Sequence, residues 1–398
     1  MPAVAIIFDN FGPYHVARLQ VASAGCDLLA IEVAGISATY AWKNESMAGT
    51  FQRVTLIEQA TSGGVSRSEL VGRLERALEQ FQPGVVVVPG WASPAAWGAM
   101  SWCVKNRVPM VCLSDSTEWD EPRVGWKEWI KRKLVGLFSS ALVAGTRASD
   151  YLTKLGMPGE RIFLGYDAVD NRYFSDRAEE IRTCGEEARR QYGLPQDYFL
   201  ASARFVEKKN LPRLLEAYAL YRASCQMPAP WSLVLLGDGP LRSVLEAKLA
   251  ALGLRDHVMM PGFKQVADLP FFYAWAGALI HPSTVEPWGL VVNEAMASGL
   301  PVLVSNRCGC APELVNEGVN GFTFDPLHVE EMAKKMWQLA AADFSREAFG
   351  KKSREIVAGW GPERFARGLS QAIEVALAGP PVFPGCVDRA LLWLLRHR

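Results

Sequence analysis

Residues 281–301, HPSTVEPWGLVVNEAMASGLP, constrain the fold of this chain more than any other stretch. The apolar run 276–280 leads into it and predicts a buried strand, and the run 301–304 predicts a second one. Between them, Pro287 suits the first turn of a helix, and residues 289–298 suit its body. The pattern therefore predicts a strand, a loop, a helix and a strand, with the helix N-terminus opening beside the carboxyl end of the first strand.

The start of this predicted helix is a candidate anion site. The N–H groups of a first turn have no partner within the helix and carry a partial positive charge, which suits a phosphate. Glu286 lies in the loop and Glu294 on the helix. We therefore expect the two carboxylates to contact different parts of one ligand.

Length and composition indicate a globular chain with two domains. Its 398 residues exceed what one domain usually holds, and a hydrophobic share of 49% is typical of a folded protein. Lysine and arginine together number 42, as do aspartate and glutamate, which disfavours a nucleic-acid partner held by bulk charge. The short uncharged start predicts no signal peptide, and no apolar run approaches the ~18 residues of a membrane span, so we expect a cytoplasmic protein.

The eight cysteines are scattered, and several lie in apolar runs, which fits reduced thiols in a cytosol. Cys308 and Cys310 form the only close pair in the sequence. No second pair follows at metal-site spacing, so we interpret this pair as loop packing rather than as a zinc site. The sequence also lacks an Asp-x-Asp motif, which favours a site that works without a metal ion.

Strands and helices alternate along both halves of the chain. Buried strands are predicted at 4–8, 26–33, 85–88, 109–113 and 141–144, and then at 198–203, 231–236, 258–261, 276–280 and 301–304. Helical stretches separate most of these runs. This alternation predicts an α/β fold with two doubly wound domains facing a cleft, and ligands are expected at the carboxyl ends of the strands.

Two stretches combine basic residues with bulky apolar ones. The predicted helix 125–140 carries Trp126 and Trp129 among lysines, a mixture that can mark a membrane-surface helix. We favour a surface helix whose tryptophans and leucines face its own core while its lysines are solvated. The tail 380–398 holds a short apolar run, 387–395, flanked by arginines. It is predicted either to lie on a membrane surface or to pack on the first domain.

Several motifs between residues 198 and 325 occur in an order that is typical of one enzyme family. Seven residues separate Glu286 from Glu294, within the context Pro-Trp-Gly-Leu and Ala-Met-Ala-Ser-Gly-Leu-Pro-Val. The other motifs are Arg204 with Lys209, Gly-Asp-Gly-Pro at 237–240, Pro-Gly-Phe at 261–263, Pro-Glu-Leu-Val at 312–315 and Asn320-Gly321. The ensemble resembles the retaining glycosyltransferases of the GT-B fold, in particular the large family numbered four among sugar transferases, the glycosyl transferases group 1 type.

The resemblance implies a GT-B fold, in which two doubly wound Rossmann-like domains face an interdomain cleft. Residues 1–168 would form the acceptor-side domain and residues 169–361 the nucleotide-sugar donor domain. A helix at 362–379 would cross back to the N-terminal domain, and an amphipathic tail would follow at 380–398.

The implied reaction is a retaining, metal-independent transfer from a UDP-, GDP- or ADP-sugar to an acceptor hydroxyl. The acceptor would be a glycan, a lipid-linked saccharide or a small molecule. The nucleotide sugar is the donor substrate, and no cofactor is implied. Peripheral contact with the inner face of a membrane is an open alternative to a purely cytoplasmic location, and the oligomeric state is left open.

Two other functions within this fold stay open. A nucleotide-sugar epimerase or hydrolase would need acidic and histidine groups around the sugar, and the chain has only five histidines. A non-catalytic sugar-nucleotide binding protein would be expected to lack Glu286, Arg204 or Lys209, and all three are present. A Rossmann dehydrogenase is disfavoured, because no G-x-G-x-x-G follows the first strand.

The chemistry of donor cleavage indicates where cations should lie. Departure of a nucleoside diphosphate builds negative charge on the leaving phosphate, so cations and N–H dipoles are expected there. Arg204 and Lys209 suit that role. The N–H groups of Trp288, Gly289 and Leu290 offer the complement of a helix terminus.

The resemblance also implies which residues contact the sugar, the ribose and the base of the donor. Glu286 would hold hydroxyls of the donor sugar, and Glu294 would hold the ribose. Gly262 and Phe263 would border the base.

The acceptor side falls to the first half of the chain. By resemblance, Gly12 would let this domain close over the phosphates, and His15 would face the acceptor. Many family members carry a histidine on the loop after the strand equivalent to 109–113, where this chain has Asp115. Asp115 or Glu118 could contact sugar hydroxyls instead. We expect a same-face transfer in which the leaving phosphate takes the acceptor proton.

Overall fold

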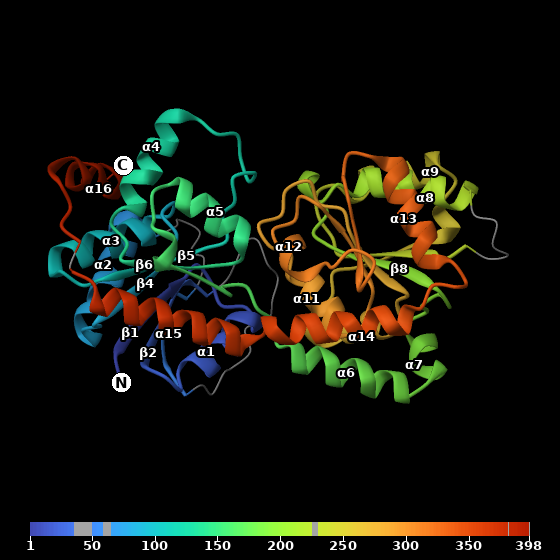
Figure 1. Cartoon of the computed structure of the whole chain (residues 1–398), viewed down its shortest axis with the longest axis horizontal. Helices are drawn as coiled ribbons and strands as arrows, with labels where there is room; N and C mark the ends of the chain where they lie inside the picture. Colours follow the sequence, from blue (N-terminus) through green and yellow to red (C-terminus); the bar gives the residue numbers. More distant parts are fainter. Residues whose placement is uncertain (36–49, 59–64, 225–229, 381, 398) are drawn as a thin grey trace. The chain divides into compact units, whose positions relative to one another are not determined.

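A computed structural model describes residues 1–35, 50–58, 65–224, 230–380 and 382–397; one of the cysteines, Cys225, lies outside them. The chain divides into two compact units (Figure 1). Unit 1 comprises Met1–Ala168 with Pro362–Arg398, and unit 2 comprises Val169–Gly361. Within the described residues, every helix is too short or too polar to cross a membrane.

Unit 1 is built on a seven-stranded parallel sheet of order β3-β2-β1-β4-β5-β6-β7. Its strands are β1 Ala3–Phe8, β2 Asp27–Ala34, β3 Gln52–Ile57, β4 Val85–Pro89, β5 Met110–Ser114, β6 Ser140–Val143 and β7 Ile162–Leu164. Near-continuous Val, Ile and Leu runs form the central strands because helices cover both faces of such a sheet. The strand order reverses between β1 and β4, where a doubly wound sheet opens a crevice for a ligand.

Seven α-helices and a short 3-10 turn accompany the described strands of unit 1. They are α1 Pro13–Ala22, α2 Arg67–Phe81, α3 Pro94–Asn106, α4 Gly125–Val135, α5 Thr146–Lys154, α15 Pro362–Ala378 and α16 Cys386–His397, with the turn at Gly159–Arg161. Ser66 caps the start of α2, since its side chain accepts a hydrogen bond from the Glu69 N–H at 3.2 Å. Although α15 follows unit 2 in the sequence, it packs against α1 and the β6–β7 end of the unit 1 sheet.

The edge strand β3 was not predicted from the sequence. Its Arg53 and Thr55 face Glu32 of β2, a buried carboxylate that accepts from Arg53 at 2.8 Å and from Thr55 at 2.9 Å. The other oxygen of Glu32 accepts from the N–H of Phe11 at 2.6 Å. Strand β3 uses Arg53 and Thr55 to bond the buried Glu32. Its sequence therefore lacks the alternation of apolar and polar residues that predicts a strand.

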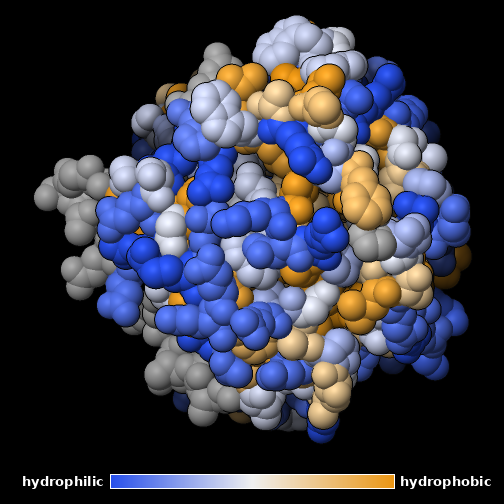
Figure 2. All heavy atoms as spheres, turned by 90° about the vertical axis from the view of Figure 1, so that its left-hand side faces the viewer, coloured by the Kyte–Doolittle hydropathy of each residue, from blue (hydrophilic) through white to orange (hydrophobic). Residues whose placement is uncertain are grey.

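Helix α4 differs from the favoured prediction in two ways. It ends at Val135, and its tryptophans, Trp126 and Trp129, are exposed instead of facing the core. One of its lysines, Lys131, is held in ion pairs rather than solvated. The reason is that only the last turn of α4 packs on the unit. Figure 2 views the molecule from the side of α16, where apolar side chains reach the surface in the upper part.

Unit 2 is built on a six-stranded parallel sheet of order β10-β9-β8-β11-β12-β13. Its strands are β8 Tyr198–Ser202, β9 Ser232–Leu236, β10 Val258–Gly262, β11 Ala278–His281, β12 Val302–Ser305 and β13 Gly321–Phe324. The order reverses between β8 and β11, so the loops after these two strands flank the ligand crevice of this sheet.

The described helices of unit 2 include nine α-helices and four 3-10 turns. The α-helices are α6 Asn171–Thr183, α7 Glu186–Gln191, α8 Leu211–Ser224, α9 Arg242–Ala251, α10 Leu269–Trp275, α11 Leu290–Ala297, α12 Ala311–Leu314, α13 Val329–Ala340 and α14 Arg346–Val357. The turns are Glu207–Lys209, Arg255–His257, Val266–Asp268 and Ala358–Trp360.

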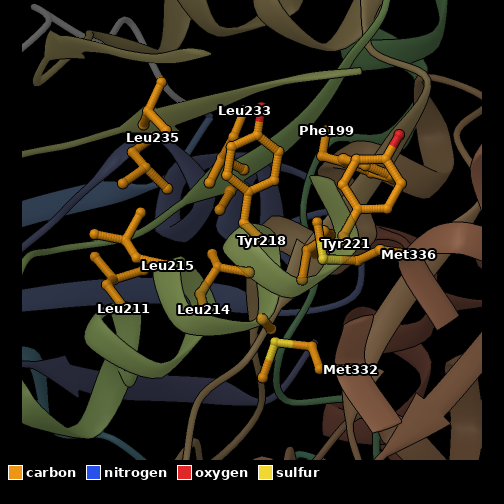
Figure 3. Close-up of a cluster of buried hydrophobic side chains, with 14 of the residues drawn as sticks. Phe199, Leu211, Leu214, Leu215, Tyr218, Tyr221, Leu233, Leu235, Met332 and Met336 are labelled. Atoms are coloured by element: carbon orange, nitrogen blue, oxygen red, sulfur yellow. The ribbon is translucent and has the colours of Figure 1, made fainter. Parts of the chain in front are cut away.

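The core of unit 2 lies between α8, α13 and the sheet. Figure 3 shows Phe199 of β8, Leu233 of β9 and Tyr218 of α8 in one buried cluster with Met332 and other side chains. Burial of this apolar surface fixes β8 against its neighbours. The loop that leaves β8 therefore starts from a rigid strand.

Candidate active site

The loops after β8 and β11 are joined by hydrogen bonds at the reversal point of the unit 2 sheet. The Thr284 N–H donates to the carbonyl oxygen of Lys208 at 2.9 Å. The buried amide of Asn210 donates to the carbonyl oxygens of Pro282 at 3.1 Å and Pro326 at 2.8 Å. Sequence reasoning missed Asn210. The backbone of Asn210 is left-handed (φ 57°), a conformation that asparagine adopts more readily than most residues. The local signal for this turn was therefore an asparagine directly after Lys208 and Lys209.

This junction brings Lys209 and Glu286 together, 77 positions apart in the chain. Lys209 Nζ donates to Glu286 Oε2, and the two side chains are only 15% and 11% exposed. The same oxygen lies 2.9 Å from His281 Nε2 and 3.1 Å from Ser283 Oγ. These bonds all reach Oε2, and no described residue bonds Oε1 of Glu286. That second oxygen can accept a hydrogen bond from a ligand hydroxyl.

The charge states at this cluster follow from burial and neighbours. Burial raises the pKa of the Glu286 carboxyl, but the Lys209 ammonium and the hydrogen bond from His281 outweigh it and hold the pKa far below its usual range. Burial lowers the pKa of His281, and with the added charge of Lys209 it outweighs the hydrogen bond and charge of Glu286, which raise that pKa. His281 is therefore neutral at pH 7, and because a carboxylate only accepts, its ring carries the proton on Nε2.

The loop after β12 braces the start of α11. The Gly309 N–H donates to the Glu286 carbonyl oxygen at 2.9 Å, and the Cys310 N–H donates to that of Trp288 at 3.2 Å. A Cβ atom on Gly309 would lie 1.6 Å from the carbonyl oxygen of Pro287, so only glycine fits. Residues 286–288 are thus paired like a strand. This pairing is why the helix begins at Leu290 and not at Pro287 as predicted.

Three predicted anion donors open the helix α11. The N–H groups of Trp288, Gly289 and Leu290 donate to no described residue. The indole of Trp288 is buried, donates from Nε1 to Asn293 at 2.9 Å and packs on the ring of Trp360. Any role of Trp288 in binding an anion therefore belongs to its backbone N–H. The open end of α11 offers partial positive charge to an anion.

Arg204 lies in the exposed loop directly after β8. Among the described residues its side chain has no hydrogen bond or ion pair. The Gly-Asp-Gly-Pro turn supports this loop, since the Phe205 N–H donates to the carbonyl oxygen of Asp238 at 2.8 Å. A hydrogen bond from Arg242 at 2.9 Å lowers the pKa of the Asp238 carboxyl. Asp238 is thus held by Arg242 within the Gly-Asp-Gly-Pro turn, where its backbone supports the loop after β8.

The remaining donor candidates lie on α11 and at the end of β10. Glu294 is buried, and Tyr273 Oη donates to its Oε2 at 2.7 Å. Gly262 has a left-handed φ of 82°, and its carbonyl oxygen accepts from the Gly237 N–H at 3.1 Å. The ring of Phe263 is exposed beside it. Since all strands are parallel, these loops share one edge of the sheet with Lys209.

In unit 1, Gly12 and His15 form the start of α1. The Gly12 N–H donates to His15 Nδ1 at 3.0 Å. Burial, and then the charge of Arg18, lowers the pKa of His15, so its neutral ring carries the proton on Nε2. Gly12 has an extended backbone with φ −110°. Its geometry does not demand glycine, although an open backbone still suits close approach of a ligand.

Asp115 directly follows β5 at the carboxyl edge of the unit 1 sheet. Burial raises the pKa of the Tyr166 hydroxyl, the charge of Arg18 opposes this rise, and the charges of Asp167, Asp115 and Asp9 add to it. Burial also raises the pKa of Asp9, which follows β1. Sequence reasoning missed Asp9 and Asp167. Asp115, Asp9 and Asp167 thus follow three strands of the unit 1 sheet, β5, β1 and β7, at its carboxyl edge.

Glu118 lies further along the loop after β5. Its exposed carboxylate pairs with Lys154 of α5. Its carbonyl oxygen accepts from Arg123 Nε at 2.7 Å. The Glu118 carboxylate is therefore engaged with α5.

Comparison with known families places the Lys209–Glu286 cluster in context. Residues 185–356 match the family model described as Glycosyl transferases group 1. The match covers most of unit 2. The matched range includes Lys209, Glu286 and Glu294, so the resemblance drawn from the motifs is confirmed.

Curated relatives match part of the chain. Alpha-D-kanosaminyltransferase of Streptomyces kanamyceticus is 30% identical over 237 residues, which cover 58% of each chain. Sulfoquinovosyl transferase SQD2 of Arabidopsis thaliana is 36% identical over 126 residues, which cover 31% of this chain and 24% of that one. The chain thus spans less than two thirds of the length of these relatives.

Solved structures match almost the whole chain at low identity. HepE of Anabaena, in complex with UDP and glucose, gives a TM-score of 0.72 at 18% identity and covers 94% of this chain and 100% of its own. Sucrose-phosphate synthase from Thermosynechococcus elongatus gives 0.72 at 19% identity, covering 94% and 98%. These likenesses show the fold, and the predicted GT-B class with Rossmann-like domains is confirmed.

Proposed function

We propose that this protein is a retaining glycosyltransferase that moves a sugar from a nucleoside diphosphate sugar to an acceptor hydroxyl without a metal ion. The observation that carries the proposal is the Lys209–Glu286 pair beside the open N–H groups of α11. At one edge of the sheet, the Lys209 ammonium and the N–H groups supply positive charge for a diphosphate, and Glu286 supplies a carboxylate for a sugar. The complex of HepE with UDP and glucose fits the same ligand class.

The diphosphate binds to Lys209, to Arg204 and to the N–H groups that open α11. When the bond from the sugar C1 to phosphate breaks, negative charge grows on the leaving oxygen, and fixed positive groups stabilise it. The Arg204 side chain is exposed and bonds no described residue, so it can turn to a phosphate without losing another bond. These groups supply the positive charge that a metal ion gives to other transferases.

The sugar and nucleoside contact the two glutamates. Glu286 Oε1 accepts from a hydroxyl of the donor sugar while Oε2 stays bonded to His281 and Ser283. Glu294, oriented by Tyr273, binds the ribose. Phe263 and Gly262 border the base, with UDP, GDP and ADP as the candidate nucleotides.

The chemical step joins the acceptor to the face that the phosphate leaves. The bond from C1 to the acceptor oxygen forms as the bond from C1 to the phosphate oxygen breaks, and the acceptor proton passes to that phosphate oxygen. We assign acceptor positioning to unit 1, where Asp115 and His15 offer an acceptor and a donor of hydrogen bonds, with Gly12 and Glu118 nearby in the chain. The acceptor is a saccharide, a lipid or a small molecule.

The test is a panel of UDP-, GDP- and ADP-sugars with the full chain in the presence of EDTA. A binding donor at 100 times its Kd should stabilise the fold by about 2.7 kcal/mol, and free nucleoside diphosphate should be released. Lys209→Ala should lose both effects, and the adjacent Lys208→Ala, whose side chain is exposed, should keep them. If no nucleotide sugar shifts the melting temperature, the proposal is wrong.

Product analysis separates the alternatives. Retention of the anomeric configuration, seen by proton NMR of the glycoside, is the expected result. A free sugar or an epimerised one as the sole product, whatever acceptor is offered, would instead support the epimerase or hydrolase. Donor binding with no turnover on any acceptor would favour a binding protein.

A further inference from the structure

Large apolar side chains are exposed in two short segments of unit 1. Among the described residues, 17 large hydrophobic side chains are exposed, and eight of them lie within residues 119–129 and 383–394. The exposed fractions are 62% for Trp126, 72% for Phe383 and 61% for Trp393. Isolated exposed hydrophobics need no explanation, but a concentration of this kind marks an interaction surface.

The two segments lie at the same end of unit 1. Lys133 of α4 is 3.6 Å from Asp388 of α16, and Figure 1 draws the two helices side by side there. One face of helix α16 packs on unit 1, because Leu392 is buried and Arg396 pairs with Glu75 of α2 at 2.9 Å. The tail thus packs on unit 1 with one face and leaves the other face exposed.

The ion pairs of α4 hold its tryptophans outward. Lys131 donates to Glu121 at 2.7 Å and to Glu128 at 3.0 Å, and Glu128 accepts from Tyr151 Oη at 2.9 Å. The polar pairs therefore lie between α4 and the unit, and Trp129 points to solvent. A helix that packs only on its own core has the opposite arrangement.

Basic side chains surround the exposed tryptophans. Helix α4 carries four basic residues and one acidic residue, in a chain whose formal net charge is zero. Lys127 Nζ lies 5.9 Å from the ring centroid of Trp126, and Lys133 Nζ lies 6.0 Å from that of Trp129. Tryptophan beside lysine is the combination found where a helix lies in a lipid headgroup layer.

From these observations we infer that the α4–α16 end of unit 1 docks on a bilayer surface that contains anionic lipid. The rings of Trp126, Trp129 and Trp393 enter the boundary between headgroups and acyl chains, and Lys127 and Arg132 contact lipid phosphates. The charge of α4 favours this occupant over a second copy of the chain, whose α4 would carry the same positive charge. The inference concerns where the enzyme works and does not depend on the donor proposal.

The test measures binding of the full chain to vesicles of phosphatidylcholine containing phosphatidylglycerol, and to vesicles of phosphatidylcholine alone, by flotation. We expect binding to the anionic vesicles, weakening with added salt. Each basic residue near the surface contributes about fivefold to partitioning, so Lys127→Ala/Arg132→Ala should weaken it more than tenfold. Lys334→Ala, on α13 of unit 2, should leave partitioning unchanged.

A second variant set tests the apolar contribution. Trp126→Ala/Trp129→Ala/Trp393→Ala should lose most of its partitioning and keep the wild-type melting temperature, because these rings are already exposed. Trp337→Ala, which removes a tryptophan exposed to 45% on α13, is the matched control. The absence of wild-type binding to anionic vesicles would overturn the inference. So would self-association in sedimentation velocity that the triple variant abolishes, because the surface would then be an interface between copies.

Discussion

Lys209 on the loop after β8 and Glu286 on the loop after β11 share one ion pair, which ties together the two loops at the reversal point of the unit 2 sheet. His281 and Ser283 also hold the bonded oxygen of Glu286. If Lys209 turns to a bound phosphate, Glu286 stays in place through these two neighbours. The pair can therefore open for a substrate without leaving the carboxylate unsupported.

The first prediction concerns turnover. Lys209→Met should lower kcat by about 10²-fold or more, because a positive group aimed at the leaving phosphate is lost. Lys208→Met removes an adjacent, exposed lysine and should stay near wild type. Steady-state release of nucleoside diphosphate measures both variants. Near-normal kcat in Lys209→Met would contradict its phosphate role.

The same lysine also affects stability. Lys209→Met should cost up to about 3 kcal/mol, the lower end of the range for a broken buried pair, because Glu286 loses its cation but keeps its bonds to His281 and Ser283. Adding Glu286→Gln should restore most of the free energy of unfolding but none of the activity. Urea denaturation of the single and double variants checks this. If the double variant were no more stable than Lys209→Met, the unpaired charge of Glu286 would not be the cause of the lost stability.

Asn210 should act by positioning the loop that bears Lys209. Asn210→Gly keeps the left-handed backbone but removes the amide bonds to Pro282 and Pro326. We expect a loss of about 1–3 kcal/mol of stability and a raised KM for the donor. Arg213→Ala is the control, because it removes only the bond from Arg213 to Asn210 Oδ1 at 3.0 Å. An unchanged KM in Asn210→Gly would argue against the positioning role.

Tyr273 should affect donor binding through Glu294. Tyr273→Phe removes the hydrogen bond to Glu294 Oε2, so the KM for the donor should rise about tenfold with little change in kcat. Tyr198→Phe is matched, since it loses a buried hydroxyl bond in the same unit, to the Phe272 carbonyl oxygen at 2.7 Å. If both variants raised the KM for the donor equally, the change would come from the loss of a buried hydrogen bond in unit 2 and not from the contact with Glu294.

The two neutral histidines predict a pH dependence. The pKa values of His15 and His281 are lowered in the folded state, so the unfolded chain binds protons first on acidification. Stability from each should be complete above the unfolded value of about 6.5 and should fall with pH towards the folded value, by up to about 1.4 kcal/mol per pH unit. His15→Gln/His281→Gln should flatten the curve between pH 7 and 5.5. If the urea midpoint of the double variant fell with pH as steeply as that of the wild type, the prediction would be wrong.

Local sequence pattern predicted the elements around the site well. The apolar runs on either side of residues 281–301 became β11 and β12, and the stretch between them holds α11. The N-terminus of the helix shifted because Gly309 and Cys310, from the next loop, pair with the backbone before it. Such pairing depends on partners about twenty positions away, and no helix signal contains it.

Polar contacts between distant residues were the part that the sequence did not reveal. Asn210 gains its role from loop residues far along the chain, and Glu32 gains its role from Arg53 and Thr55 of a neighbouring strand. Trp126 and Trp129 were expected in the core because periodicity places large apolar residues inward. The ion pairs of Lys131 reversed that orientation. Patterns of hydrophobicity do not register where charges find partners.

The backbone pairing of residues 286–288 with residues 308–310 has a consequence for how donor preference can change in such a chain. A loop whose length is fixed by a glycine with no room for one extra carbon cannot accept insertions. New preferences must then come from exchanging side chains on an unchanged backbone. Laboratory evolution of this protein should find substitutions around Glu286 and Phe263, and loop grafts across residues 286–289 should fail to fold.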